Sequence, residues 1–334
     1  MRLPLVILAA ATLLSPANAQ KRAFTIADLY RIRSVEDPQI SPDGGTIAFV
    51  VKEDDLAGGK SHAAIYAMDT GGGNLRRLTA GTGSDTHPRW SPDGSSLLFL
   101  STRNKGAQAW IIPGGGGEPK QLTDFSAGVG DPEWTADGAG IVFDSDVYPE
   151  CGADDDCNSR TGDAWSGGPL AAHMADGLLY RHWTSWRDGR RTHMLVFNRT
   201  AGTYTDLTPG DFDSPPFSLG GVGFALSPDG KEICFVSQRD GMDATTTNKD
   251  IWKAPLTGGT AANLTAGNNA YDGDPAYSPD GRYIAYRTQT VPGYESDRFR
   301  LALYDRTSGE KRILTEKFDN WVDDIAWGPD SKSI

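Results

Sequence analysis

One tetrapeptide, Ser-Pro-Asp-Gly, recurs at 41–44, 91–94, 227–230 and 278–281 of this 334-residue chain and constrains its fold more than any other feature. Proline is suited to the second position of a type I turn, aspartate to the third, and glycine tolerates the left-handed conformation that closes the turn. An apolar run follows every copy. Each tetrapeptide is therefore predicted to join two antiparallel strands.

The strand after each turn is apolar on both of its alternating faces, as in TIAFVV at 46–51 and YIAYR at 283–287. A strand that is buried on both faces lies between two other layers. A Leu-Thr pair then ends a later strand of each unit, at Thr79, Thr123, Thr208, Thr265 and Thr315. The unit is predicted to hold four strands: one before the turn, one after it, one like IYAMD, and one that ends in Leu-Thr.

Degenerate copies of the turn at 134–138 and 327–331 extend the series, so that the turn aspartates are 44 to 51 residues apart, with one interval of 92. Four-stranded units at this spacing are typical of a β-propeller. A β-sandwich is the alternative, but it does not need the same turn and strand end in every unit. We predict an all-β propeller with blades at about 38–80, 88–124, 132–208, 217–265 and 271–315, and a partial sixth blade at 321–334.

The long interval contains a single Leu-Thr end, so it is interpreted as one blade with an insertion at 145–178. The sixth blade holds one strand and the start of another. A propeller closes by packing its last blade on its first, and unpaired strand edges are hazardous. The sequence is therefore expected to be a fragment of a longer protein.

The first residues resemble an export signal. Arg2 supplies a positive charge, an apolar run follows from Leu3 to Leu14, and Ala17-Asn18-Ala19 is a small-x-small cleavage site. An uncleaved anchor is the alternative, which the cleavage site disfavours. We predict a signal peptide at 1–19 and an exported protein, periplasmic or extracellular, with no membrane span after cleavage. In the N-terminal segment 20–37, Thr25 is expected to cap a short helix.

The chain is acidic, with 32 Lys and Arg against 44 Asp and Glu and a formal charge of −12. Without a basic cluster, such a surface repels nucleic acid and anionic lipid, and we exclude both as partners. Exported proteins can keep disulfides, and Cys151 and Cys157 are predicted to form one. Cys234 lies in an apolar run and is expected to be a buried free thiol.

The segment FTIADLYRIRSVEDPQISPDGGTIAFVV (24–51), with the repeats, resembles the N-terminal half of exported prolyl oligopeptidase-family serine peptidases. Segments 146–158 and 176–198 point to the bacterial dipeptidyl-peptidase and acylaminoacyl-peptidase branch. The turns alone are shared with periplasmic TolB-like propellers, whereas the run from Tyr180 to Gly189 is more specific. In this family a propeller caps a C-terminal α/β-hydrolase domain with a Ser-Asp-His triad. The resemblance implies that this hydrolase domain is absent from the chain.

No catalytic residue is expected in the sequence itself. A nucleophile elbow of the G-x-S-x-G type is absent, since the stretches around Ser84 and Ser166 lack the required glycine or spacing. The histidines show no metal-binding spacing, and the acidic run from Asp154 fails the EF-hand pattern. No metal or cofactor is expected, and His182 and His193 are interpreted as hydrogen-bonding within the blade.

The insertion is the best candidate for a binding segment, because long excursions in a compact repeat often bind ligands. The resemblance implies that propeller carboxylates hold the ammonium group of a peptide. Glu150 is the first candidate, followed by Asp154, Asp155 and Asp156, with a solvated surface loop as the alternative. Trp183 and Trp186 are candidates for a side-chain pocket, with packing between blades as the alternative.

The sequence thus predicts the substrate-gating propeller of an exported serine exopeptidase, of the dipeptidyl-peptidase or acylaminoacyl-peptidase type, which itself lacks the triad. Its expected partners are short peptides with a free amino terminus and the missing hydrolase domain. The alternative is a periplasmic TolB-like propeller that acts as a protein-binding module.

Overall fold

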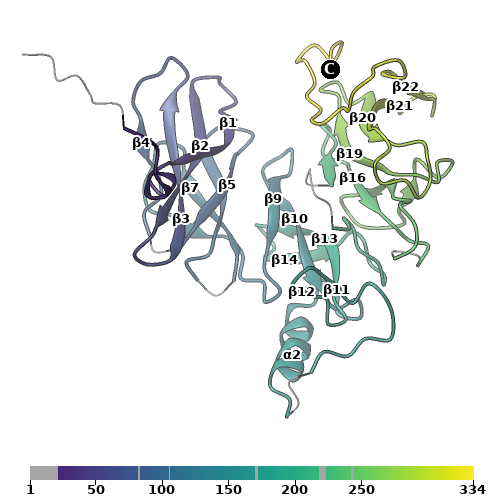
Figure 1. Cartoon of the computed structure of the whole chain (residues 1–334), viewed down its shortest axis with the longest axis horizontal. Helices are drawn as coiled ribbons and strands as arrows, with labels where there is room; N and C mark the ends of the chain where they lie inside the picture. The colour runs from purple at the N-terminus through teal and green to yellow at the C-terminus, as the bar shows by residue number, and fades with distance from the viewer. Residues whose placement is uncertain (1–21, 82, 105, 170–171, 218–222, 242–243) are drawn as a thin grey trace, which may run out of the picture.

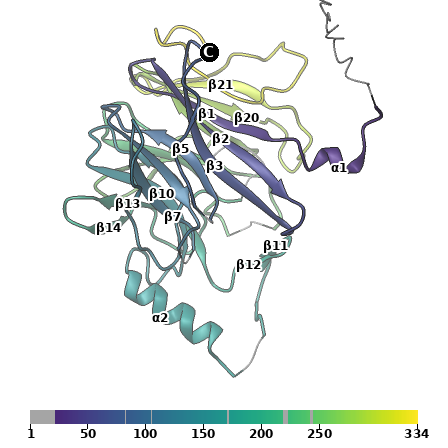
Figure 2. The same ribbon diagram turned by 90° about the vertical axis from the view of Figure 1, so that its left-hand side faces the viewer.

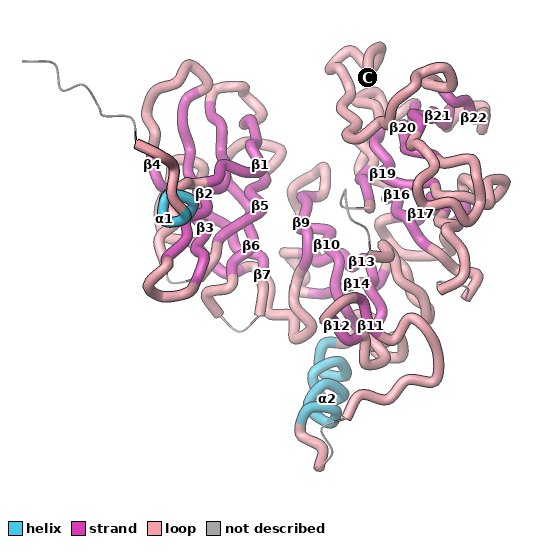
Figure 3. The backbone as a smooth tube through the Cα atoms, in the orientation of Figure 1, coloured by secondary structure: helices cyan, strands magenta, loops and turns pink. Residues whose placement is uncertain are grey.

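The computed structural model describes residues 22–81, 83–104, 106–169, 172–217, 223–241 and 244–334, so the predicted signal peptide lies outside the described residues. Five four-stranded antiparallel sheets follow one another along the chain. They are arranged in an open arc, with the first and last sheets at opposite ends (Figure 1). The regular structure is almost entirely strand, joined by long stretches of loop, and helix is confined, within the described residues, to α1 (Ile26–Leu29) and α2 (Asp155–Ser166) (Figure 3). The prediction of an all-β propeller is confirmed.

The strands of each blade pair in chain order. Blade 1 consists of β1 (Ser34–Ile40), β2 (Thr46–Asp55), β3 (Lys60–Asp69) and β4 (Arg76–Arg77). Blade 2 consists of β5 (Asp85–Trp90), β6 (Ser96–Ser101), β7 (Gln108–Pro113) and β8 (Lys120–Gln121). Blade 3 consists of β9 (Gly130–Trp134), β10 (Gly140–Val147), β13 (Arg191–Asn198) and β14 (Thr203–Asp206). Blade 4 consists of β15 (Phe224–Leu226), β16 (Glu232–Ser237), β17 (Asp250–Pro255) and β18 (Ala262–Asn263). Blade 5 consists of β19 (Asp272–Tyr277), β20 (Tyr283–Thr288), β21 (Arg300–Asp305) and β22 (Lys311–Ile313).

The repeated turns join the first and second strand of each blade, as predicted. In the first turn the Ser41 hydroxyl donates to Asp43 at 2.5 Å and accepts the N–H of Thr46 at 2.9 Å. Gly44 has a φ of 73° and donates its N–H to the Ser41 carbonyl at 2.8 Å. The same serine-to-aspartate bond recurs in the other turns, with Thr135 in place of serine in blade 3. Each turn is thus closed by its own side chains.

The threonine of each Leu-Thr pair has a structural role that the sequence did not reveal. Its hydroxyl accepts a backbone N–H from the third strand of the same blade, at 2.8 to 3.0 Å in all five blades. Thr79, Thr123, Thr208 and Thr265 are almost fully buried. Buried N–H groups need a partner, so this hydroxyl satisfies the donor where the short fourth strand has ended.

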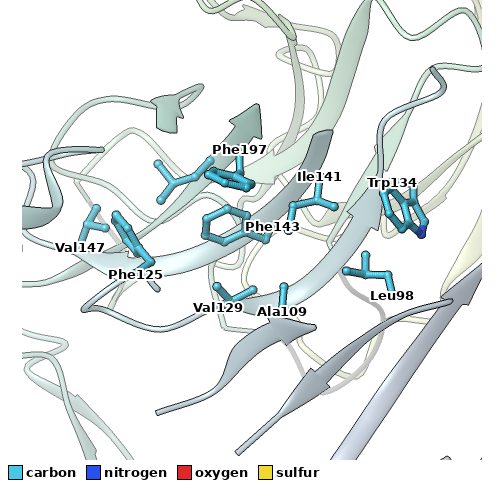
Figure 4. Packing of buried hydrophobic residues seen from close by; sticks show 10 residues of the cluster. Leu98, Ala109, Phe125, Val129, Trp134, Ile141, Phe143, Val147 and Phe197 are labelled. Atoms are coloured by element: carbon cyan, nitrogen blue, oxygen red, sulfur yellow. The ribbon is translucent and has the colours of Figure 1, made fainter. Parts of the chain in front are cut away.

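Neighbouring blades pack face to face and share apolar clusters. Figure 4 shows the cluster between blades 2 and 3, where Leu98 lies near Trp134 and Ile141, and Phe125 lies near Val147. Three further clusters join the other neighbouring pairs of blades. This packing on two sides explains why the second strands of the inner blades, such as β10 and β16, are mostly buried.

Indole side chains add hydrogen bonds between blades. The Trp90 and Trp134 indole N–H groups donate to the carbonyls of Gln39 and Arg89, each at 3.0 Å. After blade 5, Trp327 donates to Ala276 at 3.0 Å in the same way. Trp327 thus repeats the contact that Trp90 and Trp134 make with the preceding blade, although residues 321–334 form no strand.

Two helices accompany the sheets. In α1 (Ile26–Leu29), the Thr25 N–H donates to Asp28 at 2.8 Å, which agrees with the predicted cap. The other helix, α2 (Asp155–Ser166), projects away from the sheets (Figure 2). Within the residues described, neither helix is long and apolar enough to cross a membrane.

The helix α2 corrects the interpretation of Asp154 to Asp156 as a solvated loop. Asp154 is the N-cap and accepts the Cys157 N–H at 2.9 Å, while Asp155 and Asp156 occupy the first turn. Carboxylates at this end favour a helix because they complement its dipole. The segment has little apolar periodicity, so the helix could not be predicted from the sequence pattern. Cys151 and Cys157 are joined by a disulfide, with Cα atoms 5.4 Å apart, and Cys234 is a buried free thiol.

The insertion interrupts blade 3 after its second strand. It runs from the end of β10 to the start of β13 at Arg191, and is thus longer than the expected 145–178. Besides α2 it contains a hairpin of β11 (Arg181–His182) and β12 (Ser185–Trp186). The hairpin returns the chain to blade 3 and brings polar and aromatic side chains beside the ends of β9 and β10.

Candidate ligand-binding site

A cavity of about 400 Å³ lies between blade 3, the insertion hairpin and the segment that leads into blade 4. This volume falls in the range of sites for small ligands. Three kinds of side chain line it: carboxylates of β9, β10 and Asp213, the arginines of the β12–β13 connection, and rings of the hairpin and of Phe217.

The acid wall of the cavity consists of Asp131, Asp144 and Asp146. Asp131 lies at a bulge of β9 and has a φ of 35°. Asp144 faces Gly130 across the β9–β10 ladder. A Cβ atom at Gly130 would come within 2.5 Å of the Asp144 carboxylate, so the glycine makes the room for this side chain. Asp146 accepts the Thr192 hydroxyl at 2.8 Å.

The pKa of one acid-wall residue, Asp144, is strongly raised by its surroundings. Burial, followed by the charges of Asp131 and Asp146, raises the pKa of Asp144 to about 7. Both causes disfavour the carboxylate form. A hydrogen bond from its own backbone N–H lowers the pKa of Asp144, but it does not offset these two causes. A cation that enters the cavity would reverse this balance.

The repeats provide an internal comparison for the acid wall. Six residues before each turn aspartate, in the first strand or directly before it, a residue has positive φ: Asp37, His87, Asp131, Gly223 and Asp274. Seven residues after it, the second strand holds Val50, Leu100, Asp144, Val236 and Arg287. In blade 5 these positions form a pair in which the Arg287 guanidinium donates to Asp274 at 2.6 Å. In blade 3 both positions are acidic, so this arginine–aspartate pair is absent, and Asp131 lies 3.5 Å from Nδ1 of His87.

The two arginines that line the cavity, Arg187 and Arg190, contact groups other than the acid wall. Arg187 forms an ion pair with the buried Asp213, whose other oxygen accepts the Thr192 N–H at 2.9 Å. Arg190 lies over the ring of Tyr148, with its guanidinium carbon 5.3 Å from the ring centroid. The positive charge of Arg187 is therefore already paired.

The ring wall of the cavity consists of His182, Trp186 and Phe217. His182 stacks on Phe217 with 3.6 Å between ring centroids. His173 stacks parallel to Trp186 at 4.0 Å, and its Nδ1 lies 2.6 Å from the Asp188 carboxylate. Trp186 and Phe217 remain 42% and 43% exposed. A part of each of these two rings is therefore left uncovered by the described residues.

The acids that the sequence favoured lie elsewhere. Glu150 is exposed, Asp154 caps α2, Asp155 accepts the Ser126 N–H at 2.6 Å, and Asp156 is exposed on α2. None of the four lines the cavity. Their role in ligand binding stays a prediction.

Only one of the two tryptophan candidates lines the cavity. Trp186 lines the cavity, whereas Trp183 is 72% exposed and lies beside Phe217 and His182 without lining it. His193 is buried and bonded within blade 3, to Asp206 at 2.8 Å and the Gly210 carbonyl at 2.9 Å. In the part of the chain that the structure describes, no cluster of His, Cys, Asp and Glu could hold a metal ion.

The acid wall could have been found by aligning the repeats. Asp144 follows the apolar run IVF, at a position where three other blades carry Val or Leu. A charged residue at such a position breaks the pattern of the fold, and exceptions of this kind often mark a functional site. The ring wall could not be found by aligning the repeats, because its rings are brought together by the path of an insertion that the other blades lack.

Comparison with known proteins agrees with the fold. The model of the TolB β-propeller domain matches residues 25–150. The chain is 32% identical over 308 residues to dipeptidyl-peptidase 5 of Porphyromonas gingivalis, which covers 90% of this chain and 44% of that protein. The chain thus spans less than half the length of this curated relative.

Among solved structures, the chain is similar to an acylaminoacyl peptidase in complex with Z-Gly-Gly-Phe-chloromethyl ketone. The TM-score is 0.65 at 16% identity, and the match covers 89% of this chain and 42% of that one. It is also similar to the β-propeller domain of the trilobed protease from Pyrococcus furiosus. There the TM-score is 0.55 at 14% identity, with 88% and 74% covered. The resemblance to the propellers of these peptidases is confirmed.

Proposed function

We propose that this chain is the substrate-gating propeller of an exported serine exopeptidase, of the dipeptidyl-peptidase or acylaminoacyl-peptidase type, and that its cavity holds the free amino terminus of a short peptide. The similarity to dipeptidyl-peptidase 5 supports the class of enzyme. The hydrolysis itself is assigned to an α/β-hydrolase domain outside this sequence. The predicted export signal at 1–19 supports the location.

One observation carries the assignment of the amino terminus. Asp131 and Asp144 occupy the two positions that in blade 5 form an ion pair, and neither is an arginine. A peptide ammonium in the cavity would take the place that the Arg287 guanidinium takes in blade 5. Hydrogen bonds between an ammonium and carboxylates are charge-assisted and roughly twice as strong as neutral ones.

The proposed site also predicts a pH window for binding. The ligand needs Asp144 as a carboxylate, and the pKa of this group is about 7 in the empty cavity. Affinity therefore rises as Asp144 ionises. It falls again above about pH 8, where the α-amino group of a peptide loses its proton. The optimum is expected between these limits.

Calorimetry with Leu-Gly amide and its N-acetyl derivative tests the proposal. The free amine should bind at least about tenfold more tightly than the acetylated peptide, because a charged hydrogen-bonded pair contributes about 1.5 kcal/mol or more. Asp144→Asn should remove this difference. Glu150→Gln is the matched comparison: if it removes the difference and Asp144→Asn does not, the anchor lies at the disulfide loop. Equal binding of both peptides would refute amine anchoring.

The hydrolase assignment has a separate test. The reading frame that continues beyond codon 334 should encode a G-x-S-x-G elbow in a region of alternating strands and helices. A stop codon at that position would contradict the assignment while leaving the cavity unaffected.

A protein-binding propeller of the TolB type is the second candidate function. The match of residues 25–150 to the TolB propeller model favours it. In that case a folded envelope protein, and not a dipeptide amide, would bind. Crosslinking in cells that recovers one such protein, together with no binding of dipeptides, would favour this function.

A further inference from the structure

We infer that the ring wall binds the apolar side chain of the peptide's first residue, and that His173 and Asp188 are positioning residues for Trp186. The inference rests on the proposed function, since it takes the ammonium group as the second point of attachment. It adds a class of ligand: peptides whose first residue is a large aliphatic or aromatic amino acid.

The exposure of the rings is the first argument. Trp186 and Phe217 are both more than two-fifths exposed, yet they face a cavity together with Pro215 and Pro216. Apolar surface of this kind is favourably covered by an apolar group. The acid wall lines the same cavity and favours a positively charged ligand. The apolar group that covers the rings is therefore expected to belong to a cationic ligand.

The fixed orientation of the Trp186 indole is the second argument. His173 stacks on it with parallel ring planes, Tyr180 stacks at 5.7 Å, and the Arg181 guanidinium lies 5.4 Å from the ring. The Asp188 carboxylate lies 2.6 Å from Nδ1 of His173 and holds the imidazole ring in this position. A surface aromatic ring needs no such support, whereas a binding wall depends on it for its shape.

The arrangement of the two walls is the third argument. In an amino-terminal residue the ammonium and the side chain are bonded to the same Cα atom, so a binding site must present a carboxylate and an apolar surface within one small cavity. Blade 3 supplies the carboxylates of β9 and β10, and the hairpin supplies Trp186. The intervening Arg187 is paired with Asp213 and does not attract a competing carboxylate.

The test compares Leu-Gly amide with Gly-Gly amide by calorimetry on the whole chain. The leucine peptide should bind about tenfold more tightly, the gain expected when about half of a leucine side chain is covered. Trp186→Ala and Phe217→Ala should each reduce this ratio to about twofold or less. Trp165→Ala is the matched control, because Trp165 is 47% exposed on α2 and lies outside the cavity.

His173 is tested by rescue. His173→Ala should lower the ratio, and His173→Phe, which keeps a ring against Trp186, should restore most of it. A ratio near one in the unchanged chain, or a full ratio in Trp186→Ala, would overturn the inference. The acetylated peptide separates the two proposals: if acetylation has no effect while the leucine ratio persists, amine anchoring fails and the ring wall stands. Absence of binding by every peptide overturns both.

Discussion

Replacing Asp144 by asparagine should stabilise the fold, and more so at high pH than at low pH. Asparagine has nearly the same shape as aspartate but carries no charge. In the folded protein the pKa of Asp144 is about 7, against an ordinary value of 3.8. Between these two values the folded state holds a proton that the unfolded chain has lost. The free energy of unfolding therefore falls as pH rises through this window.

The size of the effect follows from the shift. About three pKa units correspond to about 4 kcal/mol, of which about two-thirds falls between pH 5 and pH 8. The cavity is open to water, which screens charges, so we reduce the part of the free energy that falls between these two pH values by about half. Asp144→Asn should therefore gain about 1.5 kcal/mol more stability at about pH 8 than at about pH 5.

Urea unfolding at the two pH values, followed by tryptophan fluorescence, measures this difference. Asp272 and Asp274 also have raised pKa values, but both are present in each protein, and their contributions cancel in the comparison. Asp156→Asn, exposed on α2, is the control and should show no difference between the two pH values. An Asp144→Asn variant that gains nothing at about pH 8, or that loses stability there, would refute the electrostatic reasoning.

Three further variants test the fold and the site. Thr265→Val removes the hydroxyl that accepts a buried N–H and should cost about 1 to 3 kcal/mol of unfolding free energy. Thr315 has the same role but is partly exposed, so Thr315→Val should cost less than about 1 kcal/mol. Equal losses in urea unfolding would contradict this reasoning. Gly130→Ala places a Cβ atom against the Asp144 carboxylate and should weaken binding of Leu-Gly amide about tenfold or more; unchanged calorimetric affinity would contradict the position of the anchor. Asp144→Arg should form an ion pair with Asp131 in blade 3 that is equivalent to the Arg287–Asp274 pair of blade 5. It should raise the urea midpoint at neutral pH and abolish amine binding. A lowered midpoint would argue against the equivalence of the two blades.

The fold could be predicted from the sequence because its decisive contacts are local. The hydrogen bond between Ser41 and Asp43 spans two residues and recurs in every turn, so the same short motif reappears wherever the same geometry is needed. The burial of both faces of a second strand is likewise visible in a run of five or six apolar residues. The Leu-Thr ends were recognised as markers, although the role of Thr79 in satisfying the N–H of Ile65 could be seen only from the structure.

The site could not be predicted in the same way. Its carboxylates belong to different strands, and Phe217 approaches from the segment before blade 4. The acidic run at Asp154 to Asp156 was conspicuous in sequence, but these residues begin a helix because their charges favour its first turn. Asp144 was inconspicuous, since a single acid at the end of an apolar run has no local signature.

A repeat protein offers a way around this difficulty, because each blade is a control for the others. Blade 3 departs from its neighbours in three respects: Asp144 stands where other blades carry an apolar residue or an arginine, an insertion follows its second strand, and aromatic rings of that insertion stay exposed. Each departure alone has an ordinary explanation as surface variation. All three border the same cavity, where they combine the Asp144 carboxyl group, for which the described residues provide no ion pair, with partly exposed aromatic rings and the connection that carries them. Independent surface variation has no reason to converge in this way, and the convergence supports the proposal that the cavity binds a small cationic, apolar ligand.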